Sequence, residues 1–234
     1  MKYLVCNQKM FLTKDEAYEL RNNLDDLNLG VSDKLIIAPS FIYFDIFKGY
    51  NLCSQNVFYE DKGAFTGEIS PYMLSLINVK YALIGHSERR CFDDDKIINL
   101  KIKACVKNCI TPILCIGETK IERELRKTSL VIKQQLTKAF EGVSLDDFEV
   151  FIAYEPRYLI GKNKTMIKDE IEDTIKYIKK VLKELGIEKY KILYGASLNK
   201  DNIKKIDSSL LDGYLLGSAS IYIDEIKEII KCIK

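Results

Sequence analysis

Eight short apolar runs, separated by longer amphipathic stretches, constrain the fold of this 234-residue chain more than any other feature. Most of these runs are apolar at every position, whereas a strand with one face in water would alternate apolar and polar residues. Continuous apolar runs are typical of parallel strands that are buried on both faces. The predicted strands are Tyr3–Cys6, Leu35–Ala38, Leu52–Ser54, Tyr81–Ile84, Pro112–Ile116, Val150–Ala153, Ile192–Tyr194 and Gly213–Leu216.

The stretches between the predicted strands have the pattern of amphipathic helices. Thr13 and Glu16 form a capping box, which predicts a helix running towards Leu24. Gly186 follows a long helical pattern and is expected to end that helix. The other predicted helices are Asp93–Asn108, Glu122–Phe140, Lys168–Leu185 and Ile221–Ile233.

Eight strand-plus-helix units favour a single (β/α)8 barrel, with eight parallel strands inside and the helices outside. The pattern alone also fits an open, doubly wound sheet. No Pro/Gly/Ser-rich linker or low-complexity segment divides the chain, so we expect one catalytic domain that spans residues 1–234.

Composition excludes several classes of function. With 36 basic and 34 acidic residues, the chain lacks the basic excess of a general nucleic-acid binder. The first apolar run is too short for a signal peptide, and no run approaches the roughly 18 apolar residues of a membrane span. The seven cysteines contain no Cys-x-x-Cys pair, and no histidine lies near Cys105 and Cys109 to complete a metal site. We expect a soluble cytoplasmic protein with reduced thiols and no bound metal, nucleic acid or membrane.

Polar residues follow the predicted strands, and in a barrel these strand ends converge on one face. Asn7 and Lys9 follow the first strand, His86 the fourth and Glu155 the sixth. Pro156 biases Glu155 towards extended geometry, which directs its side chain off the end of the strand. The seventh and eighth strands are followed by Ser197, Gly217 and Ser218.

Each of these residues alone has an ordinary explanation, as a loop polar residue, a structural histidine or a turn residue. Together they form a coherent chemical set. A carboxylate can move a proton between two carbons, while a neutral imidazole and an ammonium can polarise two oxygens. Glycine turns at helix N-termini can bind a phosphate through backbone N–H groups. With no metal cluster and no dinucleotide fingerprint, the set predicts cofactor-free proton transfer beside a carbonyl of a small phosphorylated substrate.

The order of motifs along the whole chain resembles the triosephosphate isomerase family. The matching segments are Asn7-Gln8-Lys9, Gln55-Asn56, Gly63–Glu68, Gly85–Arg90, Cys115–Glu118, Ala153–Pro156, Ile160-Gly161 and Tyr194–Ser197. The resemblance implies a (β/α)8 barrel that interconverts dihydroxyacetone phosphate and D-glyceraldehyde 3-phosphate through an enediolate, in glycolysis and gluconeogenesis. It also implies a homodimer.

The resemblance assigns roles to residues at matching positions. Glu155 takes the proton from carbon, His86 polarises the carbonyl as a neutral ring, Lys9 supplies positive charge and Asn7 orients the substrate. Ser87 and Glu88 support these side chains, and Thr66 crosses the dimer interface. Phosphate contacts are expected from Asn7, Lys9, Gly161, Ser197, Gly217 and Ser218. The expected lid consists of Pro156, Arg157, Tyr158, Leu159, Ile160, Gly161, Lys162 and Asn163.

The chain departs from the family pattern at the lid and at the phosphate turns. It contains no tryptophan, and Gln8 and Tyr158 stand at two positions where the family commonly has one. Arg157 replaces an aliphatic lid residue and Lys162-Asn163 replaces Thr-Gly. Gly195-Ala196 and Gly217-Ser218 each replace a Gly-Gly pair. These changes concern lid motion and phosphate affinity.

Two other functions compete with this interpretation. One is a phosphate-binding barrel enzyme that acts on a larger phosphorylated substrate, and the other is a barrel that binds phosphate without catalysis. Neither requires Asn7, Lys9, His86 and Glu155 together.

Overall fold

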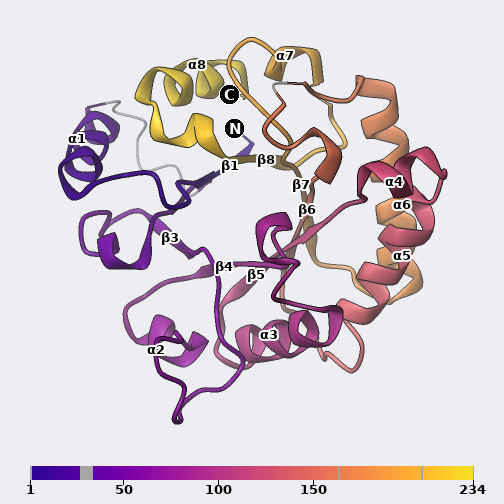
Figure 1. The fold of residues 1–234 in the computed structure, drawn as a ribbon, viewed down its shortest axis with the longest axis horizontal. Helices are drawn as coiled ribbons and strands as arrows, with labels where there is room; N and C mark the ends of the chain where they lie inside the picture. Colours follow the sequence, from indigo (N-terminus) through magenta and orange to yellow (C-terminus); the bar gives the residue numbers. More distant parts are fainter. Residues whose placement is uncertain (1, 27–33, 163, 207, 234) are drawn as a thin grey trace.

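The computed structural model describes residues 2–26, 34–162, 164–206 and 208–233. Its eight parallel strands pair in chain order, and the last pairs with the first to close a barrel. Figure 1 shows the ring of strands with helices around its outside. The closed (β/α)8 barrel is therefore confirmed, and the open sheet is excluded. The strands are β1 (Tyr3–Asn7), β2 (Leu35–Ala38), β3 (Asn51–Ser54), β4 (Tyr81–Ile84), β5 (Thr111–Ile116), β6 (Val150–Tyr154), β7 (Tyr190–Tyr194) and β8 (Gly213–Leu216).

Burial on both faces explains why the strands lack an alternating pattern. On β1, Leu4 and Cys6 pack in the layer between strands and helices, whereas Val5 packs inside the barrel. Neighbouring strands repeat this division. The inner cluster consists of Val5, Ile36, Ala38, Cys53, Leu83, Ile113, Cys115, Phe151, Ala153, Leu193 and Leu215.

Local signals set the helix ends much as expected. In the capping box of α1, the Glu16 N–H donates to Thr13 Oγ1 and the Thr13 N–H donates to the Glu16 carboxylate. Gly186 follows α6 with a φ of 71°, a conformation that glycine adopts without strain. The α-helices are α1 (Lys14–Asp25), α2 (Pro71–Leu76), α3 (Asp95–Lys107), α4 (Lys120–Glu124), α5 (Thr128–Ala139), α6 (Lys168–Glu184), α7 (Ile203–Ile206) and α8 (Ile223–Ile233).

Three helix predictions need correction. The single helix predicted over Glu122–Phe140 is two helices, because Arg126 takes a φ of 56° and the Lys127 N–H turns back to the Glu122 carbonyl. The last helix begins at Ile223, because a 3-10 helix, η4 (Ser218–Ile221), precedes it. Between β2 and β3 the described residues form a 3-10 helix, η1 (Phe41–Tyr43), and no α-helix.

The two ends of the described chain meet at the closure of the barrel. The Lys2 N–H donates to the Ile233 carbonyl at 3.2 Å, and β1 pairs with β8 over four residue pairs. Among the described helices, none combines the length and the apolar character needed to cross a membrane.

Candidate active site

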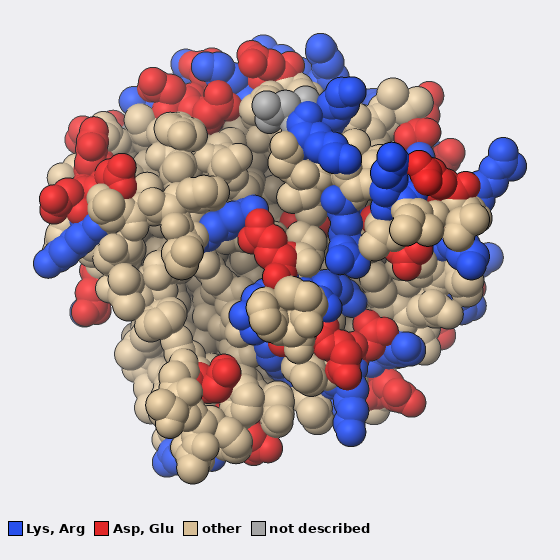
Figure 2. Space-filling view, viewed as in Figure 1, with Lys and Arg blue, Asp and Glu red and all other residues tan. Residues whose placement is uncertain are grey.

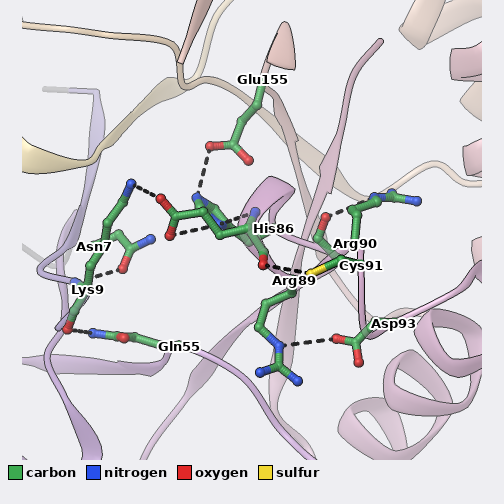
Figure 3. Close-up of polar contacts among 11 residues, drawn as sticks. Asn7, Lys9, Gln55, His86, Arg89, Arg90, Cys91, Asp93 and Glu155 are labelled. Atoms are coloured by element: carbon green, nitrogen blue, oxygen red, sulfur yellow. Dashed lines mark hydrogen bonds and ion pairs between the residues drawn. The ribbon is translucent and has the colours of Figure 1, made fainter. Parts of the chain in front are cut away.

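The predicted catalytic residues follow the carboxyl ends of three strands and converge on one pocket. Asn7 is the last residue of β1, His86 lies two residues after β4, and Glu155 directly follows β6. Figure 3 shows these side chains and Lys9 grouped around a common space. The pocket has a volume of about 540 Å³. Its lining includes every predicted catalytic and phosphate-binding residue, namely Asn7, Lys9, His86, Glu155, Gly161, Ser197, Gly217 and Ser218.

Glu155 and His86 face each other in the interior of this pocket. Glu155 Oε1 lies 3.4 Å from His86 Nε2, and the two residues are only 4% and 6% exposed. The second carboxylate oxygen, Oε2, is buried and makes no hydrogen bond with any residue that the structure describes. An acceptor with an unused lone pair is suited to take a proton from a substrate in the pocket.

The environment of His86 sets both the position of its proton and its pKa. The Glu88 N–H donates to His86 Nδ1 at 3.3 Å, so the neutral ring carries its proton on Nε2, towards Glu155. Burial lowers the His86 pKa, but the charges of Glu155 and Glu88 outweigh burial and raise it above its ordinary value. The resemblance implies a neutral ring, whereas these charges favour the protonated ring in the ligand-free protein, so the neutral ring is the form present only above the raised pKa.

Two glycines leave the space in which Glu155 sits. A Cβ on Gly117 would lie 2.0 Å from the Glu155 carbonyl oxygen, so no side chain fits at the end of β5. A Cβ on Gly195 would lie 3.2 Å from Glu155 Cγ. Burial and then the Glu155 carboxylate raise the pKa of Cys115 well above its ordinary value. The role of Gly117 was not predicted, although a glycine directly after a predicted strand marks such a close approach.

Lys9 is fixed by backbone contacts and by one ion pair. Its φ of 52° lies in the left-handed region, and its N–H donates to Asn7 Oδ1 at 3.1 Å. Gln55 Nε2 donates to the Lys9 carbonyl at 2.8 Å, as Figure 3 shows. The Lys9 ammonium pairs with Glu88 Oε1 at 2.6 Å. Glu88 therefore contacts both Lys9 and His86, whereas the buried Ser87 hydroxyl has no hydrogen-bond partner among the described residues.

Four of the predicted phosphate contacts, Gly161, Ser197, Gly217 and Ser218, lie on turns after β6, β7 and β8, whereas Asn7 and Lys9 lie at the end of β1. Gly217 lies beside Lys9, because a Cβ on Gly217 would be 3.5 Å from Lys9 Cε. Ser197 has a φ of 47°, and its hydroxyl donates to the Leu159 carbonyl at 2.6 Å and accepts from the Lys162 N–H at 3.3 Å. Gly161, in the left-handed region at φ 73°, has open space around it.

The predicted lid begins with a 3-10 helix, η3 (Arg157–Leu159), and rests on neighbouring loops. The Arg157 N–H donates to the Glu118 carbonyl at 3.0 Å, and the Tyr158 ring packs against the apolar layer between strands and helices. Beyond the lid, the Met166 N–H donates to the Tyr194 hydroxyl at 3.3 Å. Asn163, the last predicted lid residue, lies outside the described residues.

Thr66 lies apart from the pocket, in the exposed loop 63–68. The loop is stiffened by Phe65, whose ring packs on Phe58 with centroids 4.7 Å apart. In the described part of the chain, no group of three or more His, Cys, Asp or Glu side chains could hold a metal ion.

Comparisons with known proteins show the family of the chain. The family model described as "Triosephosphate isomerase" matches residues 2–233. A triosephosphate isomerase from Clostridium perfringens is 39% identical, with 96% of each chain covered. The triosephosphate isomerases of Thermodesulfovibrio yellowstonii and Caldanaerobacter subterraneus are 38% and 37% identical, with 94% and 96% of each chain covered. The chain belongs to the triosephosphate isomerase family, isomerases that interconvert dihydroxyacetone phosphate and D-glyceraldehyde 3-phosphate in glycolysis.

Proposed function

We propose that this chain carries out the family's isomerisation with Glu155 as the base and His86 as the electrophile. The observation that supports this most strongly is the buried Glu155–His86 contact inside a pocket that also contains Lys9 and the Gly217 turn. The family is itself the standard example of a glutamate base beside a neutral histidine.

In the proposed reaction, Glu155 removes a proton from one carbon of the bound triose and returns it to the neighbouring carbon. The unused Oε2 lone pair is available for this transfer. The His86 Nε2–H stabilises the oxygen on which negative charge develops, and the Lys9 ammonium adds positive charge beside it. No external oxidant or reductant is needed, because one carbon is oxidised while its neighbour is reduced, and a proton passes from the hydroxyl oxygen to the former carbonyl oxygen as the two groups exchange.

The phosphate of the substrate would occupy the side of the pocket formed by Gly161, Ser197, Gly217 and Ser218. Glycine and serine leave room for a phosphate to approach the backbone N–H groups of these turns. Because Gly217 lies beside Lys9, one ammonium can interact with both the phosphate and the reacting oxygens. Asn7, which holds the Lys9 backbone, would orient the same part of the substrate.

Residues Pro156–Lys162 with Asn163 are proposed as the lid, which excludes water and protects the enediolate from loss of phosphate. The family's lid is itself a known example of such a closing loop. The hydrogen bonds of Ser197 with Leu159 and Lys162 hold the described part of this loop against the turn after β7.

We also propose a cytoplasmic homodimer in which residues 1–234 form one catalytic domain. A groove of about 660 Å³ adjoins the catalytic pocket and shares Asn7, Lys9 and His86 with it. Its rim contains exposed apolar side chains, including Met10, at 95% exposed. Loop 63–68 of a second copy, with Thr66 at its tip, is the proposed occupant of this groove.

Turnover of glyceraldehyde 3-phosphate by the purified protein, without added metal or nucleotide, tests the proposed function. We expect steady conversion to dihydroxyacetone phosphate. Turnover only of larger phosphorylated substrates, or phosphate binding without turnover, would support the two competing functions instead.

A further inference from the structure

Arg123, on α4, contacts groups at both ends of the β6–α6 connection, whose first part is the proposed lid. Its Nη1 lies 3.7 Å from Glu118 Oε1, and its Nη2 pairs with Glu170 Oε2 at 3.0 Å. Its guanidinium also lies 5.9 Å from the centroid of the Tyr158 ring. Tyr158 is in the first turn of the lid, and Glu170 is in the first turn of α6, to which the lid leads.

Glu118 connects Arg123 to the start of the lid in a second way. Its carboxylate is fully buried and accepts hydrogen bonds from Tyr154 at 3.1 Å and from Thr128 at 3.3 Å. Its backbone carbonyl accepts the Arg157 N–H, the first lid hydrogen bond. A guanidinium that pairs with Glu118 therefore stabilises the residue that anchors Arg157.

We propose that Arg123 is a positioning residue for the lid, holding the Tyr158 and Glu170 ends of the β6–α6 connection in the docked conformation. A planar guanidinium can stack on a ring while its edges pair with two carboxylates, whereas a lysine ammonium is a point charge that cannot do both. In a lid that lacks tryptophan, this contact gives the smaller Tyr158 ring a fixed place. Through the lid, Arg123 acts on phosphate retention without touching the substrate.

The first test is hydrogen exchange in the ligand-free protein, which does not depend on the proposed function. In Arg123→Gln, we expect the Arg157 and Lys162 amides to exchange about threefold to tenfold faster, the range expected for one cation–π contact and partly exposed ion pairs. Lys120→Gln is the matched control, because Lys120 is on the same helix and, among the described residues, its ion pair is with the exposed Glu124. The lid amides of Lys120→Gln should exchange as in wild type.

Variants at Tyr158 identify the contact that matters. Tyr158→Phe keeps the ring and should keep wild-type exchange, whereas Tyr158→Leu should exchange as fast as Arg123→Gln. In the double variant Tyr158→Leu/Arg123→Gln, the increase in exchange rate should be smaller than the product of the two single increases, because both changes remove the same contact. Arg123→Lys should fall between wild type and Arg123→Gln.

The second test measures inorganic phosphate binding and product partition, and this part rests on the proposed function. Arg123→Gln should bind phosphate about threefold to tenfold more weakly and release a larger fraction of methylglyoxal than Lys120→Gln. Wild-type exchange and wild-type phosphate binding in Arg123→Gln would overturn the proposal, even with a lower Tm, since Arg123 would then be only structural. If the wild-type protein fails to isomerise trioses, the proposed function fails, while the exchange data still decide the role of Arg123.

Discussion

The position of Glu155 depends on two neighbouring glycines as well as on hydrogen bonds. Gly117 lets the end of β5 approach the Glu155 carbonyl, and Gly195 leaves room for its Cγ. The Glu155 N–H donates to the Ile116 carbonyl at 2.8 Å, which continues the β5–β6 ladder to the catalytic residue. A carboxylate fixed in this way has little freedom to adjust if its length changes.

We therefore expect Glu155→Asp to lower kcat far more than it changes KM. The shorter side chain withdraws the carboxylate by about one methylene, and misplacement by about 1 Å can cost on the order of 10²-fold in rate. Steady-state kinetics measures both constants. Glu149→Asp is the control, because Glu149 lies at the opposite end of β6 and pairs with Lys191. Near-normal turnover in Glu155→Ala would contradict the proposed mechanism.

The single imidazole of the chain allows a direct test of the charges around His86. Glu155 and Glu88 raise its pKa despite burial, so its NMR titration in the ligand-free protein should lie above about 6.5. In Glu155→Gln burial remains while the nearer charge is lost, and the pKa should fall. Because the pKa of His86 is higher in the folded than in the unfolded protein, its protonation stabilises the fold. This contribution to the free energy of unfolding is fully present below about pH 6.5 and is lost as the pH rises through the folded-state pKa. Urea unfolding at several pH values measures the difference in free energy of unfolding between wild type and His86→Gln, and this difference should decrease as the pH rises. An unshifted His86 titration would contradict the prediction.

Secondary-structure elements were predictable where burial imposes a pattern. The strands are apolar on both faces because they pack inside and outside the barrel, and a capping box marks the start of α1. The break between α4 and α5 was not predictable, because Arg126 adopts a left-handed conformation without glycine or proline nearby. The 3-10 helix η4 was also missed, since its Ser-Ala-Ser-Ile sequence does not distinguish a 3-10 turn from the loop expected before Ile221.

Helix α3 is tied to two loops of the site by one buried charge, which gives a stability prediction. Lys101 is 2% exposed, and its ammonium contacts Asp93 at 2.7 Å and Asn56 at 2.8 Å. Removing one partner of a buried ion pair typically costs about 3–5 kcal/mol. Lys101→Met should therefore lower the free energy of unfolding by that order in urea denaturation. Lys96→Met, at an exposed position of the same helix, should have little effect, and equal stability of the two variants would contradict the prediction.

The lid gives a prediction about product identity. Deleting Ile160–Lys162 removes Gly161 from the pocket and the N–H that donates to Ser197. The barrel should stay folded, phosphate should bind more weakly, and part of the enediolate should eliminate to methylglyoxal and free phosphate. Product analysis beside wild type measures the partition, and circular dichroism checks the fold. Unchanged turnover without methylglyoxal would show that this segment is not the lid.

At the scale of the whole molecule, the candidate site combines loops from both halves of the chain. Residue types and motif order selected catalytic and phosphate-binding candidates that all line one pocket, because the strand ends of a barrel must converge. Their contacts were not predictable from sequence. The Lys9–Glu88 ion pair joins residues 79 positions apart, and its formation depends on the left-handed backbone at Lys9 and on the turn after β4. Figure 2 shows basic and acidic side chains interspersed over the face viewed, so the overall balance of charge says little about the pocket itself.

Assembly provides the last prediction. Met10, Phe11, Phe41 and Ile42 are exposed in the isolated chain, and the groove beside them shares Asn7 and Lys9 with the catalytic pocket. A second copy that inserts loop 63–68 would bury this surface and restrain both catalytic residues. Thr66→Arg should block insertion by placing a charged side chain at the loop tip, and the resulting monomer should have a kcat at least about tenfold lower, since small misplacements of catalytic groups are costly. Sedimentation and activity measured over one dilution series test the two effects together. Leu130→Arg, which puts the same charge on an exposed residue of α5, should remain dimeric and active; a fully active Thr66→Arg monomer would separate assembly from catalysis.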